Sequence, residues 1–149
     1  MTSWSPVSVI GFKAAAGGAI SNPNLDDTDL QYNGSFSLLH EETGLNLTLS
    51  SGMLDRDNQG DGQNYYAKAG WLKRFFSFGE TAFGVDYTRS LNVPTDSDDG
   101  YSIGAAAVQP FDEYGTEIFA LYRLHSLDRD VEPDVHDISV VSIGARVKF

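Results

Sequence analysis

Apolar and polar residues alternate along most of this chain with a period of two. In the clearest stretch, residues 30–38, the even positions carry apolar side chains or glycine and the odd positions carry polar side chains. That period predicts a β-strand with one apolar and one polar face. A turn-forming stretch at residues 40–44 and a second alternating run at residues 45–50 then predict a hairpin.

Six further segments alternate in the same way, so eight strands are predicted. The first, residues 7–20, is expected to be one strand with Ile10, Phe12, Ala14 and Ala16 on its apolar face. The apolar positions of the other five are Tyr65, Ala67, Ala69 and Trp71; Phe83, Val85 and Tyr87; Tyr101, Ile103, Ala105 and Ala107; Ile118, Ala120, Tyr122 and Leu124; and Val141, Ile143, Ala145, Val147 and Phe149. Helical periodicity is nearly absent.

The connections between these segments alternate in length. Residues 21–29, 54–64, 94–100 and 126–137 form long connections, whereas the connections near residues 40–44, 77–80 and 110–115 are short. Long loops at one end and short turns at the other are typical of outer-membrane barrels. The fold class predicted is therefore all-β: a single-domain, antiparallel, up-and-down transmembrane β-barrel of about eight strands over residues 1–149.

Aromatic residues are expected to form two bands near the strand ends. Tyr32, Tyr65, Tyr87 and Tyr101 lie toward the long connections, and Trp71, Phe75, Phe76, Phe111 and Phe149 toward the short turns. Such bands are typical of the two levels at which a membrane protein meets lipid headgroups.

Charge is distributed unevenly along the chain, whose formal net charge is -11. Fourteen of the 21 acidic residues lie in the four long connections. The negative charge argues against nucleic acid as a partner, because such binding needs a basic surface. The chain has no cysteine, which excludes disulfides and thiolate metal sites. The first six residues lack the basic and apolar regions of a secretory signal, so we expect a removed signal or a longer parent protein.

The predicted strands carry charged residues on their polar faces. These candidate pore-lining residues are Lys13, Lys68, Asp86, Glu117, Arg123, Arg146 and Lys148. They have two interpretations: a charge set that tunes ion selectivity in a wet pore, or a salt-bridge network that fills a narrow barrel. An eight-stranded barrel is just wide enough for side chains, which favours the salt-bridge network if the chain forms a barrel alone. A ring of ~16 strands leaves a water channel, which favours the pore if the chain is half of a longer parent.

Candidates for other chemistry are weak. Asp55–Gly60 is similar to the start of a calcium loop, but Tyr66 stands where the bidentate glutamate is needed. His125 with Asp128 or Asp130 is the one combination that could support catalysis, and it lacks the remaining groups of an active site. We expect no catalytic residue, no metal site, no cofactor and no enzyme activity.

Residues 139–149 resemble the C-terminal strand of Gram-negative outer-membrane proteins, with a terminal Phe149 preceded by Val141, Ile143, Ala145 and Val147 at alternate positions. Residues 34–48, 79–87 and 116–123 resemble hairpins of proteobacterial porins, so the resemblance covers about residues 30–149. It implies an outer-membrane porin for passive diffusion of small hydrophilic solutes or ions, of which this chain is either the whole barrel or the C-terminal half. It also implies contact with lipid and lipopolysaccharide, recognition of the terminal strand by the barrel assembly machinery, and a homotrimer.

Two other functions remain open from the sequence. One is a small closed outer-membrane barrel with a structural or adhesive role. The other is a soluble, lipocalin-like barrel that binds a ligand. The soluble barrel would place the apolar side chains inside and the polar ones outside, which inverts every facing assigned above.

Overall fold

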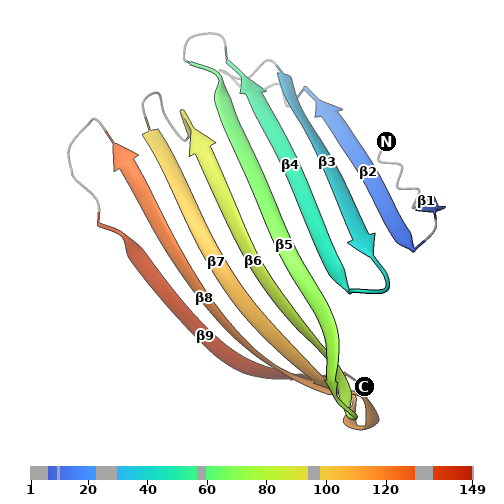
Figure 1. Ribbon diagram of the computed structural model, residues 1–149. Helices are drawn as coiled ribbons and strands as arrows, with labels where there is room; N and C mark the ends of the chain where they lie inside the picture. The colour runs from blue at the N-terminus through green and yellow to red at the C-terminus, as the bar shows by residue number, and fades with distance from the viewer. Residues whose placement is uncertain are drawn as a thin grey trace.

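The computed structural model describes residues 7–9, 11–22, 30–56, 60–93, 98–129 and 136–148. They form one antiparallel sheet in which each strand pairs with its neighbours in sequence, in the order β1 to β9 (Figure 1). The strands are β1 (Val7–Val9), β2 (Phe12–Ser21), β3 (Leu30–His40), β4 (Leu45–Asp55), β5 (Gly62–Phe76), β6 (Gly79–Leu91), β7 (Asp98–Phe111), β8 (Thr116–Arg129) and β9 (Ile138–Val147), with a 3-10 helix η1 (Asp112–Tyr114) between β7 and β8. The described residues include no helix long and apolar enough to cross a bilayer.

The predicted all-β, up-and-down architecture is confirmed. The short turns between β3 and β4, β5 and β6, and β7 and β8 lie at one end of the sheet (Figure 1). The strand ends joined by the longer connections lie at the opposite end. Gly44 has a φ of 72° in the β3–β4 turn, a left-handed conformation that glycine adopts without strain.

The ladders align the alternating residues into rows that cross the sheet. One row of register partners carries small or apolar residues: Ala14, Leu38, Leu47, Ala69, Val85, Ala105, Tyr122 and Val141. The next row is mostly polar: Ala15, Ser37, Thr48, Lys68, Asp86, Gly104, Arg123 and Val140. The side chains of adjacent rows point to opposite sides of the sheet, because successive side chains along a strand alternate between its two faces. The sheet therefore has an apolar face and a polar face.

The N-terminal segment differs from the prediction of one strand over residues 7–20. It forms a hairpin of β1 and β2, with Gly11 at a φ of 77° between them. Because glycine permits this left-handed conformation, the chain reverses there and nine strands form in place of eight. Phe12, Ala14 and Ala16 lie on the apolar face as predicted, and Ile10 is outside the described residues.

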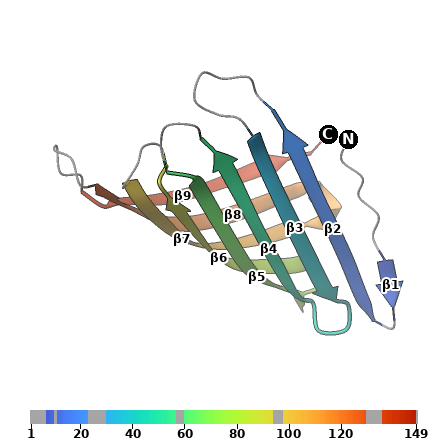
Figure 2. The same ribbon diagram turned by 90° about the horizontal axis from the view of Figure 1, so that it is seen from above.

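The predicted closed barrel is not formed by the described strands. The sheet coils, with β7–β9 passing behind β2–β5 when seen from above (Figure 2). Within the described part of the chain, however, β9 is hydrogen-bonded to β8 and to no other strand, so the sheet is open. Closing eight strands requires tight curvature, because such a ring is only wide enough for its side chains. The curvature of this sheet falls short of that.

Burial in this sheet is the reverse of that in a soluble domain. No hydrophobic residue among those described is buried, whereas Thr81, Asp98, Ser102 and Glu117 are. On the apolar face, Ile143 is 79% exposed. Soluble proteins expose single apolar residues but rarely a contiguous apolar surface. None of the described residues therefore covers the apolar face.

Candidate functional site

The polar face is organised around an ion pair that spans three strands. Arg123 on β8 reaches Asp86 on β6 with Nη2–Oδ distances of 2.7 and 2.8 Å. Its Nη1 donates a hydrogen bond to Ser102 Oγ on β7, at 3.2 Å. The two charged side chains are only 33% and 16% exposed. This charge-assisted pair fixes the guanidinium over the middle of the face.

Gly104 on β7 makes this crossing possible. It is the register partner of both Asp86 and Arg123. A Cβ atom at this position would lie 2.7 Å from Arg123 Nη2 and 2.7 Å from Asp86 Oδ2. The missing side chain therefore leaves the space that the ion pair occupies.

Lys68 adds a second cation to the same row. It is the register partner of Asp86 on β5, and within the described residues it forms no ion pair. Two cations and one carboxylate thus share the centre of the polar face. The register row that contains Lys68, Asp86 and Arg123 therefore carries a net positive charge.

A second charged cluster lies nearer the short turns. Glu117 on β8 forms ion pairs with Arg146 and, at 3.1 Å, with Lys148 Nζ. The carboxylate side chain is 10% exposed, whereas those of Arg146 and Lys148 are 64% and 66% exposed. These cations therefore present most of their surface to solvent while they hold Glu117.

All seven predicted pore-lining residues lie on the polar face, but not in one cluster. Lys13 lies apart from the others, and its Nζ is 2.6 Å from Glu41 in the β3–β4 turn. A further ion pair, which the sequence pattern did not predict, lies at the opposite end of the face. There Arg129 Nε is 3.1 Å from Oδ1 of the buried Asp98. Both residues fall inside predicted loops, and only the β7–β8 ladder shows them to be partners.

The candidate catalytic and calcium-binding groups of the sequence are not brought together among the residues that the structure describes. His125 pairs with Ser102 on the polar face, while Asp128, three residues along the same strand, points to the other side. Asp130 and residues 57–59 of the calcium-like loop lie outside the described residues. The described residues contain no group of three or more side chains arranged to hold a metal ion.

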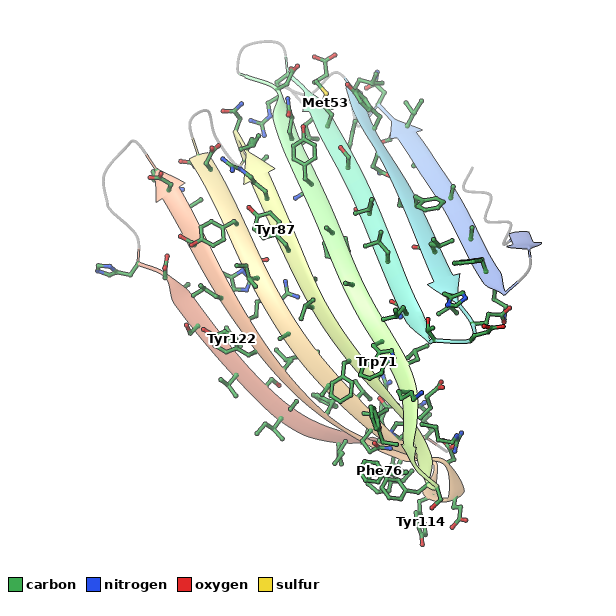
Figure 3. The ribbon with its side chains drawn as sticks, in the orientation of Figure 1. Met53, Trp71, Phe76, Tyr87, Tyr114 and Tyr122 are labelled. Atoms are coloured by element: carbon green, nitrogen blue, oxygen red, sulfur yellow. The ribbon has the colours of Figure 1, made fainter. Side chains whose placement is uncertain are left out.

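Aromatic side chains occupy both ends of the apolar face. Tyr87 lies toward the long connections, and Trp71 and Phe76 lie toward the short turns, while Tyr122 lies near the middle of β8 (Figure 3). Trp71 packs against Phe75 and Phe83 at ring-centroid distances of 5.5 and 6.4 Å.

The apolar positions of the terminal strand, Val141, Ile143, Ala145 and Val147, share the apolar face with these aromatic residues. Their register partners on β8 include Tyr122, Ala120 and Ile118, which lie on the same side. Phe149, the last residue of the predicted assembly signal, is outside the described residues.

No protein-family model, curated protein or solved structure matches this chain. The class of this protein is therefore defined by its geometry alone. It is an all-β protein with one antiparallel up-and-down sheet, one apolar face and one charged face.

Proposed function

We propose that this chain forms the wall of a porin-like pore in the bacterial outer membrane, through which small hydrophilic solutes and ions diffuse passively. The observation that carries the proposal is the reversed burial: no apolar side chain among the described residues is buried, many are exposed along one face, and the side chains that are buried are polar. Lipid is the solvent that favours this arrangement, because acyl chains cover the apolar face without cost.

The aromatic residues support a membrane setting. Tyr32, Tyr65, Tyr87 and Tyr101 are 39–46% exposed on the apolar face, toward the long connections. Trp71, Phe75 and Phe76 are exposed toward the other end. Aromatic rings favour the headgroup level, where a polar edge meets water and the ring meets acyl chains. The apolar band between the two groups would then face the hydrocarbon.

The charged residues favour an interior filled with water over an interior filled with packed side chains. An unpaired or partly paired charge is costly in a dry interior. Lys68 has no ion-pair partner among the described residues, and Arg146 and Lys148 share one carboxylate. Water in a lumen would solvate these cations. They would then act on passing ions, as charged rings do in other pores.

The two alternative functions have less support. A lipocalin-like barrel would need the apolar side chains crowded inside, whereas here they are the exposed set. A small closed barrel would need β9 to meet the first strands, and the described strands leave the sheet open. The proposal includes lipid and lipopolysaccharide around the apolar face and recognition of the β9 end by the assembly machinery.

The direct test is single-channel recording after the purified chain is refolded into a planar bilayer. We expect stepwise, ohmic conductance in KCl, because a wet pore passes ions without gating chemistry. Protein boiled in SDS and not refolded is the control. If the refolded protein co-floats with lipid vesicles but produces no conductance steps, the pore function is wrong.

A further inference from the structure

We infer that a second copy of this chain completes the barrel, with β9 of each copy paired to β2 of the other. The inference rests on the proposed pore, since only a lipid-embedded wall must close. It makes the functional unit a two-chain ring with eight long strands from each copy.

The sheet has two edges that require partners. The outer side of β9 is unpaired within the described residues, and β1 covers only residues 12–14 of β2. The β9 edge lacks the usual protection: it contains no proline, and its one charge, Arg146, turns to the polar face to pair with Glu117. Unpaired backbone groups are not tolerated in hydrocarbon. Further strands must therefore cover β9 and the part of β2 that β1 leaves unpaired.

The strand directions fit a second copy. An even number of antiparallel strands runs from β2 to β9, so these two edge strands point in opposite directions. A two-fold axis along the barrel keeps the direction of every strand. β9 of one copy then lies antiparallel to β2 of the other, like every other neighbouring pair in the sheet. The same contact forms twice, and the ring closes.

The side-chain faces fit as well. On β2 the polar face carries small residues, Ala15, Gly17 and Ala19, at the part of the edge that β1 leaves free. On β9 the polar face carries Val140, Ser142, Gly144 and Arg146. The opposite side of both strands carries Ala16, Ile20, Val141, Ile143 and Ala145. Joining the strands therefore continues both faces without placing a charged residue on the lipid side.

Pore width favours two copies over closure within one chain. A ring of eight strands has an interior filled by side chains, while about sixteen strands leave an aqueous channel. The polar face carries Lys68 without an ion-pair partner among the described residues, and Arg146 and Lys148 remain largely exposed. These cations need the water that only the wider ring supplies.

The experiment is disulfide mapping, which is clean because the chain has no cysteine. Ala19→Cys on β2 is combined in turn with Val140→Cys, Ser142→Cys, Gly144→Cys and Arg146→Cys on β9, so that the register of the new contact need not be assumed. After refolding into lipid and oxidation, we expect at least one combination to give a covalent dimer on a non-reducing gel. The control is Ser37→Cys on the interior strand β3 in place of Ala19→Cys, which should give none.

Other outcomes overturn the inference. A disulfide within one chain, seen as a monomer that migrates faster, means that β2 and β9 of the same copy meet. Absence of any disulfide, together with a monomeric mass of the refolded protein, means that no second copy is present. Conductance separates this inference from the proposed function. A cross-linked dimer that passes no ions refutes the pore alone, and a conducting monomer refutes the two-copy ring alone.

Discussion

At the scale of single residues, the polar face depends on where side chains are absent. Gly104 and Gly84 both lie on this face, but only Gly104 has charged atoms within 3 Å of where a Cβ would be. At Gly84 the nearest atom, Lys68 Cε, would be 3.6 Å away, an ordinary contact. The two glycines therefore form a matched pair for substitution.

Gly104→Ala should displace Arg123 from Asp86, because the new methyl group would take the space of the ion pair. We expect a loss of about 1–2 kcal/mol in the free energy of unfolding, the scale of a charge-assisted hydrogen bond that is partly solvated. Urea unfolding in lipid vesicles measures it. Gly84→Ala should be close to neutral, and an equal loss in both variants would contradict the assigned crossing.

Asp86→Asn should make the pore more anion-selective. The substitution removes the one carboxylate from the row that holds Lys68 and Arg123. The reversal potential across a KCl gradient reports the change. Asp99→Asn is the control, because Asp99 pairs with Arg89 at 3.5 Å on the apolar side of the β6–β7 ladder. A similar shift from both variants would show that the polar face does not line the path of the ions.

At the scale of elements, β4 offers the sharpest contrast between faces. Leu47 is 41% exposed on the apolar face, and Ser50 lies on the polar face of the same strand. Leu47→Arg should destabilise the refolded protein by about 2–4 kcal/mol, the cost of a cation at the lipid midplane. Ser50→Arg should cost far less, because its charge would reach water. The free energy of unfolding of each variant in vesicles measures the two costs. Equal costs would contradict the assignment of Leu47 to the lipid side and Ser50 to the water side.

The β3–β4 turn and β5 are tied together by Trp71, whose Nε1 donates a hydrogen bond to the Thr43 carbonyl at 2.9 Å. In a Trp4→Phe background Trp71 is the one tryptophan left. We expect lipids brominated near the headgroup to quench its fluorescence more than lipids brominated at the chain end, because interfacial tryptophans lie at that depth. No quenching by either lipid would place Trp71 outside the membrane.

Much at this scale could be predicted from local pattern. Alternation identified both faces because side-chain direction in a strand depends only on position parity. It could not locate the reversal at Gly11 or the bulge between Lys73 and Phe76, which depend on backbone dihedrals and pairing. Nor could it pair Arg123 with Asp86, 37 residues earlier, since that contact needs the register of two ladders.

At the scale of the whole molecule, closure was the part that the sequence could not decide. Whether two edges meet depends on the summed twist and coil of every strand, not on any local run. The even strand number and the alternation of long and short connections were predictable, and they hold for β2 to β9. The open edge of β9 emerged only from the assembled sheet.

The most direct test of the central claim, that the apolar face meets lipid and the polar face meets water, is a nitroxide scan along β4 in bilayers. Each residue from Leu45 to Ser50 is replaced by a spin-labelled cysteine, and collisions with oxygen and with a polar nickel chelate are measured. Oxygen collisions should peak at Leu45, Leu47 and Leu49, and chelate collisions at Asn46, Thr48 and Ser50. The opposite phase, or no alternation, would contradict the account.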